Sequence, residues 1–147
     1  MTSLHQIRMA SNAYIRDFDT QVELSLDKVE QKITNLNRKQ LLSSKDNKDR
    51  PLMNNQTGKT TLSPAYAKRT GKKRPNLKLK GTFQFDMFTD FRMPNKYFQQ
   101  SSDFKQKFLT KMYDGVFGVS PKNQSQAKEI TTKVIVADYR RVVWLKI

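Results

Sequence analysis

The sequence predicts an α+β fold in one small domain, with a long N-terminal helix, a short helix, a β-hairpin and C-terminal helices. Three observations predict it. Apolar residues recur every three or four positions before residue 42, they mainly alternate between residues 83 and 100, and Ser-Pro pairs stand where two later helices would begin. The length of 147 residues is typical of one domain, so residues 1–147 are expected to fold together.

The first element is defined by apolar residues that would share one helix face. No Pro or Gly occurs in residues 1–50, and charged residues lie off this face. One helix over about 11–41, with an earlier turn or two, is therefore expected. Several of its apolar residues stand seven apart, so the helix seam could pack on a neighbouring subunit as well as on its own domain. The helix seam consists of Ile15, Phe18, Val22, Leu26, Val29, Ile33 and Leu36.

A polar loop at 43–61 follows, because its composition turns to Ser, Asn, Asp, Lys, Gln, Gly and Thr. Ser63-Pro64 is typical of a helix cap followed by a first-turn proline, and it predicts a short helix from Pro64 to about Thr70. Gly71 would end that helix, and the residues up to Lys80 are expected to be extended.

Phe83, Phe85 and Met87 open a mainly alternating stretch, which is broken at Pro94-Asn95 and resumes over 96–100. This pattern predicts a two-stranded hairpin. Ser102-Asp103 can cap the next helix, which would end near Asp114-Gly115. The expected apolar face of that helix consists of Phe104, Phe108, Leu109 and Met112.

Ser120-Pro121 repeats the cap-and-proline signature and starts the last element. Apolar residues from Ala127 to Ala137 keep helical spacing, whereas β-branched residues crowd the same stretch and favour strand. A helix is expected, and the choice between helix and strand stays open for residues 131–147.

Composition argues against an enzyme. The chain has no cysteine, which excludes thiolate chemistry and sulfur-bound zinc, and its one histidine, His5, has no ligand residue at metal-binding spacing. The acidic residues form no close pair in an apolar setting. Gly58-Lys59-Thr60 lacks the preceding glycine of a phosphate-binding loop, since Met53 occupies that place. No catalytic residue, metal or cofactor is expected.

Charge is the strongest signal, since 28 Lys and Arg against 13 Asp and Glu give a formal charge of +15. From Arg50 to Phe85 there are nine basic residues and no acidic one. Such a density attracts phosphate groups, although few aromatic residues are interleaved for base stacking. An acidic protein surface is an equally suitable partner. The basic segment, residues 68–80, supplies the expected contacts through Lys68, Arg69, Lys72, Lys73, Arg74, Lys78 and Lys80.

No apolar run approaches the roughly 20 residues of a membrane helix, and the first residues lack the apolar core of a secretory signal. A soluble chain made in a cytoplasm, without a membrane partner, is therefore expected.

Three blocks of sequence resemble tailed-bacteriophage virion morphogenesis proteins of the tail-completion, head-tail joining or minor-tail type. The central block has the form L-S-P-x-Y-A followed by a basic turn, a proline and a glycine. Tyr113 to Ser120 is similar to a segment of relatives in phages of Bacteroidetes, and residues 36–41 fit an N-R-x-Q-L pattern. Lys80 departs from the usual Thr before the glycine, and residues 139–147 depart from the expected charged helical tail. The central block comprises Leu62, Ser63, Pro64, Tyr66, Gly71, Pro75, Leu77, Gly81 and Phe83.

The resemblance implies a subunit that acts in copies, as a ring that joins portal to tail and seals or guides the DNA path. Its implied partners are further copies of the chain, portal, adaptor or other neck and tail proteins, and the packaged double-stranded DNA. The implied location is the virion neck or tail, after synthesis in the bacterial host cytoplasm. The central block would set the local fold, and the basic segment would make the contacts. The alternative is a free nucleic-acid-binding protein without sequence specificity, which the charge favours.

Overall fold

The computed structural model describes residues 3–77, 82–93 and 96–145. These residues form helices and one antiparallel hairpin, which confirms the expected α+β class. In chain order the elements are α1 (Leu4–Arg16), α2 (Phe18–Asp27), α3 (Glu30–Leu42), α4 (Pro64–Thr70), α5 (Thr82–Phe85), β1 (Met87–Met93), β2 (Lys96–Ser101), α6 (Gln106–Met112) and α7 (Pro121–Leu145).

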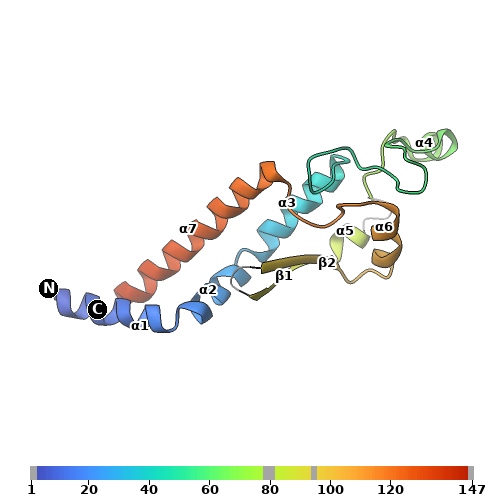
Figure 1. Cartoon of the computed structure of the whole chain (residues 1–147). Helices are drawn as coiled ribbons and strands as arrows, with labels where there is room; N and C mark the ends of the chain where they lie inside the picture. Colours follow the sequence, from blue (N-terminus) through green and yellow to red (C-terminus); the bar gives the residue numbers. More distant parts are fainter. Residues whose placement is uncertain (1–2, 78–81, 94–95, 146–147) are drawn as a thin grey trace.

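The molecule is elongated (Figure 1). α1, α2 and α3 follow one another as a bent rod, and α7 runs back beside them, so the start of α1 and the end of α7 lie at the same end. The loop after α3 gathers with α4, α5 and α6 at the other end. We call the first part, α1–α3 with α7, the rod, and the second part, residues 43–77 with α5 and residues 102–117, which include α6, the lobe. None of the helices within the described ranges combines the length and apolarity needed to cross a membrane.

The predicted N-terminal helix is divided into three. The helix breaks at Asp17, whose φ is −100° and ψ is 22°, and again at Lys28 and Val29. Neither break contains Pro or Gly, so local preferences gave no sign of it. A one-residue break also preserves the spacing of three or four between apolar residues, which is why the pattern was indistinguishable from that of one long helix.

The predicted helix seam is buried from Val22 onwards, as expected, but its first two residues are exposed. Ile15 is 64% exposed and Phe18 is 47% exposed, whereas Ala10 and Tyr14 are buried in their place. Tyr14 packs edge-on against Tyr139 of α7, so the buried line shifts by one residue across the break. The buried core of the rod contains Val22, Leu26, Val29, Ile33, Leu36 and Val119, with Phe91, Ala127, Ile130, Val134 and Ile135 packed against it.

The sequence left helix and strand both open for residues 131–147. Residues 131–145 are helical and belong to α7. The apolar residues at helical spacing pack on α1–α3, and this packing outweighs the strand preference of the β-branched residues. Thr131 fits into the helix because its hydroxyl donates a hydrogen bond of 2.9 Å to the carbonyl of Ala127. Residues 146–147 lie outside the described residues.

The predicted hairpin is present, but it begins later than expected. β1 and β2 pair antiparallel, with Met87 opposite Ser101, and the predicted break at Pro94-Asn95 lies outside the described residues. Phe83 and Phe85 belong to α5 instead of a strand. Phe83 is buried in the lobe while Phe85 is 82% exposed, so their alternation had suggested a strand face that does not exist.

The polar loop at 43–61 is anchored to the lobe. Leu52 within it is 1% exposed and joins the lobe core, and Asn54 forms isolated bridges with Lys59 and Tyr113. The core of the lobe contains Leu41, Leu52, Phe83, Met87, Tyr113 and Val116. The prediction of a polar loop at 43–61 did not include this anchoring, because Leu52 and Met53 side by side among polar residues give no periodic signal.

The two short helices of the lobe differ in how well the sequence predicted them. α4 has the predicted bounds: the Ser63 hydroxyl accepts from the N–H of Tyr66, and Gly71 ends the helix at φ +68°. α6 begins at Gln106, later than expected, and the predicted apolar face is only half correct. Phe104 is 87% exposed and Phe108 is 60% exposed, so only Leu109 and Met112 pack on the lobe core.

Candidate functional site

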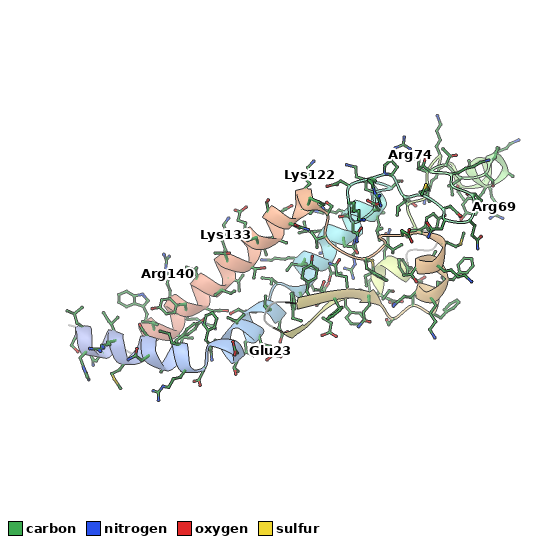
Figure 2. The ribbon with its side chains drawn as sticks, viewed as in Figure 1. Glu23, Arg69, Arg74, Lys122, Lys133 and Arg140 are labelled. Carbon is green, nitrogen blue, oxygen red and sulfur yellow. The ribbon has the colours of Figure 1, made fainter. Side chains whose placement is uncertain are left out.

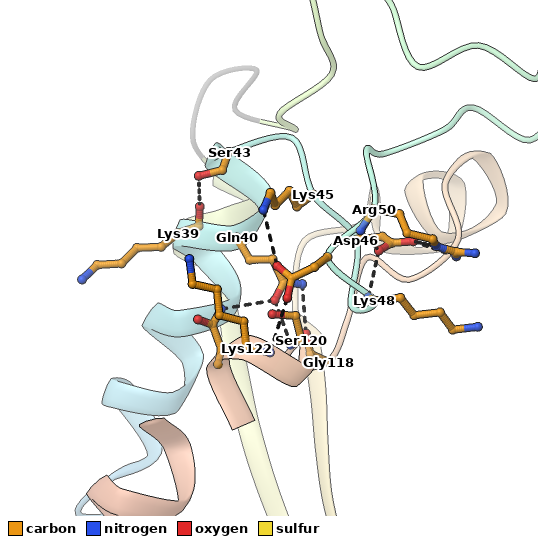
Figure 3. Close-up of polar contacts among 12 residues, drawn as sticks. Lys39, Gln40, Ser43, Lys45, Asp46, Lys48, Arg50, Gly118, Ser120 and Lys122 are labelled. Atoms are coloured by element: carbon orange, nitrogen blue, oxygen red, sulfur yellow. Dashed lines mark hydrogen bonds and ion pairs between the residues drawn. The ribbon is translucent and has the colours of Figure 1, made fainter. Parts of the chain in front are cut away.

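Two segments that are distant in sequence meet where the rod joins the lobe (Figure 3). The side-chain amide of Asn37 donates to the carbonyls of Val116 and Gly118, at 3.2 and 3.0 Å. The Gln40 amide donates to the Gly118 carbonyl at 3.2 Å, and its oxygen accepts from the Ser120 N–H at 2.9 Å. Buried amides thus fix the turn that precedes α7.

Arg38 lies on the neighbouring face of α3 and holds the start of the hairpin. Its guanidinium donates to the carbonyls of Gln84, Phe85 and Met87, at 2.6, 2.8 and 2.7 Å. Lys39, the next residue, is exposed. The N-R-x-Q-L pattern therefore has a structural explanation at each specified position, because Asn37, Arg38 and Gln40 bind backbone and Leu41 is fully buried.

A groove of about 1030 Å³ opens in the lobe, which we call the lobe groove. It lies between α4, residues 72–77, α5 and α6. Most residues of the central block line it, and Gly71 instead ends α4 beside it, while Gly81 lies outside the described residues. The apolar lining consists of Leu62, Pro64, Tyr66, Pro75, Leu77, Phe83, Phe108, Leu109, Met112 and Tyr113.

The charged side chains described in the groove lining are cationic. Lys59, Lys72 and Lys105 line it, and none of its described lining residues is acidic. Lys72 Nζ lies 3.3 Å from the Asn76 side-chain oxygen, and Lys105 Nζ lies 3.2 Å from the Thr82 hydroxyl and 3.6 Å from a carboxylate oxygen of Asp103. Lys59 is exposed. The lobe groove is therefore an apolar surface with positive charge around it.

The structure places the basic segment at the tip of the lobe. Lys68 and Arg69 stand in the last turn of α4, where a cation is favoured by the helix dipole, and Arg69 lies 4.9 Å from the centre of the Tyr66 ring. Lys73 and Arg74 are exposed beyond it. Figure 2 shows Arg69 and Arg74 at this end of the molecule.

Among the described members of the basic segment, Lys72 alone also lines the lobe groove. Lys78 and Lys80 lie outside the described residues. No carboxylate within the described ranges pairs with Lys68, Arg69, Lys72, Lys73 or Arg74. These cations are therefore available to an external partner.

Unpaired negative charge lies in the rod. Asp17, Asp19, Glu23 and Asp27 are exposed and take part in none of the ion pairs between described residues. Glu23 is far from Arg69 and Arg74 in Figure 2. The acidic residues of α2 therefore lie apart from the cations of the lobe tip, although exposed cations such as Lys133 and Arg140 also stand on the rod.

The buried carboxylates have structural partners. Asp46 accepts from the N–H groups of Lys48 and Arg50 at 2.8 Å each, and the Arg50 guanidinium lies 2.7 Å from its other oxygen. Burial by itself raises the pKa of Asp46, but the hydrogen bonds from Arg50 and Lys48 outweigh it, so this pKa lies below the ordinary value of 3.8. Across the described part of the chain, no three His, Asp or Glu residues are grouped so that they could hold a metal ion.

Sequence reasoning found the basic segment and the central block but not the lobe groove that joins them. Lys59, Lys105 and Phe108 come from segments on either side, and only their meeting in space gives them a shared surface. No protein-family model matches this chain, and neither a curated protein nor a solved structure shows significant similarity to it.

Proposed function

We propose that this protein is a structural subunit of a tailed-phage particle, placed at the head-tail neck or upper tail. Copies of it assemble as a ring that joins portal to tail and seals or guides the DNA path. The proposal rests on the resemblance of three sequence blocks and on one structural observation, the exposure of large apolar side chains at both ends of the molecule.

Large apolar side chains are exposed at both ends of the molecule. Phe85, Phe104 and Phe108 project from the lobe at exposures of 82, 87 and 60%, and Leu4 and Trp144 project from the far end of the rod at 85 and 65%. Apolar surface of this kind is typical of contacts between proteins. A subunit with neighbours on both sides would bury it.

The unpaired cations at the lobe tip suit the second part of the proposed role. In a ring, the positive charge of each copy adds to that of the next, so the tips would present a cationic band to DNA or to an acidic adjoining ring. The same cations favour the alternative function, a free nucleic-acid-binding protein without sequence specificity.

Reversal of three lobe-tip charges tests the proposal. The variant Lys72→Glu, Lys73→Glu, Arg74→Glu should keep the circular dichroism spectrum of the wild type, yet fail to enter phage particles or leave particles that do not retain DNA. A control variant, Lys128→Glu, Lys133→Glu, Arg140→Glu, changes the net charge equally on exposed positions of α7 and should assemble normally. Infectious particles formed by the lobe-tip variant would refute the role given to these cations.

The mass of the protein in solution separates the two functions. Light scattering at two salt concentrations, with and without duplex DNA, should show a chain that associates with itself irrespective of DNA if it is an assembly subunit. A monomer that coats DNA in a salt-sensitive manner would favour the alternative.

A further inference from the structure

The lobe groove restricts what can occupy it. Its lining is mainly apolar, and the charged side chains that line it in the described residues, Lys59, Lys72 and Lys105, are all cationic. An occupant that matches this surface presents apolar side chains flanked by negative charge. Duplex nucleic acid matches poorly, because its bases are paired inside the double helix and its phosphates would leave the apolar lining without a partner.

The outward face of α2 has this chemistry. Leu24 is 52% exposed at its centre, and Glu23 and Asp27 lie on the same side of the helix. Residues 17–27 contain four acidic residues and no basic one, in a chain whose formal charge is +15. No other stretch of that length is as acidic.

The lobe groove and the face of α2 cannot meet within one molecule. α2 lies in the rod, and the lobe groove lies among α4, α5 and α6 beyond the opposite end of α3 (Figure 1). The rigid connections at Asn37, Arg38 and Gln40 hold the rod and the lobe in this arrangement. A contact between the two surfaces therefore joins two copies.

We infer that the lobe groove of one copy receives the outward face of α2 of a second copy, with Leu24 among the apolar lining and Glu23 and Asp27 opposite the groove lysines. Such a contact is heterologous, because two different surfaces meet, and repetition of it closes a ring or extends a filament. The inference rests on the proposed function, since it supplies the copy-to-copy contact of that ring.

A charge exchange tests the contact in the full-length chain. Glu23→Lys with Asp27→Lys, or Lys59→Glu with Lys72→Glu, should each weaken self-association by about tenfold or more in sedimentation equilibrium at low salt. The variant with all four changes restores opposite charges across the contact and should recover most of the association. The control, Lys107→Glu with Lys111→Glu, alters exposed α6 residues that do not line the lobe groove and should associate like the wild type.

A covalent test locates the contact directly, because the chain has no cysteine of its own. Leu24→Cys with Phe108→Cys, treated with a short bis-maleimide, should give a ladder of cross-linked copies. Leu24→Cys with Val136→Cys, which places the second thiol on α7, should not.

Three results would overturn the inference: a four-change variant that associates no better than either parent, cross-linking that is equal in the two cysteine pairs, or a wild-type chain that remains monomeric in sedimentation equilibrium. Particle assembly by Lys73→Glu with Arg74→Glu, a lobe-tip variant that leaves the groove lysine Lys72 unchanged, judges the proposed function separately, so the failure of this contact is distinguishable from the failure of the phage role.

Discussion

Lys28 Nζ lies 2.7 Å from one carboxylate oxygen of Asp138 and 2.8 Å from the other, which ties the break between α2 and α3 to the C-terminal half of α7. The Ser25 hydroxyl donates to the same carboxylate at 2.8 Å. Asp138 is buried while the Lys28 side chain is 45% exposed, so water screens one side of the pair. The contact positions two helices and contributes only modestly to the free energy of unfolding.

The carboxylate of Asp138 should make the free energy of unfolding depend on pH in the acid range. Burial by itself raises the pKa of Asp138, but hydrogen bonds from Lys28 and Ser25 and the charges of Lys28 and Arg141 bring this pKa below the ordinary value of 3.8. A carboxyl group whose pKa is lower in the folded state stabilises fully above its unfolded pKa. That contribution is lost as the pH falls through the folded pKa.

The variant Asp138→Asn should therefore lower the melting temperature at pH 7 by about 3 °C, corresponding to about 1 kcal/mol. Its melting temperature should also fall less steeply than that of the wild type below about pH 4. Glu23→Gln, at an exposed and unpaired carboxylate, should change neither quantity in dilute protein. If the melting temperatures of Asp138→Asn and the wild type depended identically on pH, the stabilising role of the Asp138 carboxylate would be contradicted.

Arg38 is expected to stabilise the attachment of the hairpin to α3. Arg38→Ala leaves three backbone carbonyls without a charged donor, and the free energy of unfolding should fall by about 2 kcal/mol in urea denaturation. Arg38→Lys should recover only part of this, because one ammonium cannot reproduce the guanidinium fork. Lys39→Ala is the matched control and should cost about 0.5 kcal/mol or less. Equal effects at the two positions would be inconsistent with the structure.

Gly115 and Gly71 allow backbone strain to be separated from steric conflict. Both have positive φ, at +66° and +68°, but an added Cβ at Gly115 would lie 2.5 Å from the Asn47 side-chain oxygen, whereas none of the surrounding atoms is within 4 Å of one at Gly71. Gly71→Ala should cost about 1 kcal/mol and Gly115→Ala about 2–3 kcal/mol in thermal or urea unfolding. Comparable losses would indicate that Asn47 moves aside freely.

Leu41 and Leu42 are neighbours with opposite environments. Leu41 is fully buried in the lobe core, and Leu42 is 40% exposed. Leu41→Ala should lower the free energy of unfolding by about 3 kcal/mol because it leaves a cavity, while Leu42→Ala should cost under about 1 kcal/mol. Chemical denaturation of both variants checks the comparison, and a larger loss at Leu42 would exclude the described orientation of the end of α3.

α4 shows what can be predicted from adjacent residues. Ser63 and Pro64 start it and Gly71 ends it as expected, because caps and a left-handed C-terminal residue act within one turn of the chain. The first helix of the rod, α1, shows where prediction from adjacent residues fails. Its buried side passes through Tyr14 and not Ile15, because a kink at Asp17 reorients the helix without altering the spacing of its apolar residues.

The candidate site was likewise predictable only in part from the sequence. The basic segment is visible as a run of charge, but its separation from the acids of α2 depends on how the rod and the lobe are joined. Phe108 was expected on the inward face of its helix, and it instead stands half-exposed at the lobe groove.

The sequence by itself determined the α+β class, the short capped helix, the hairpin and the strong positive charge, since each follows from local periodicity, local capping or simple composition. Only the tertiary structure decided that α7 is a helix to residue 145, that the rod is bent, and that segments near residues 59, 72 and 105 surround one groove. The physical reason is that these outcomes depend on contacts between residues far apart in the chain. Buried area and hydrogen bonds across those contacts outweigh the local preferences that a sequence displays.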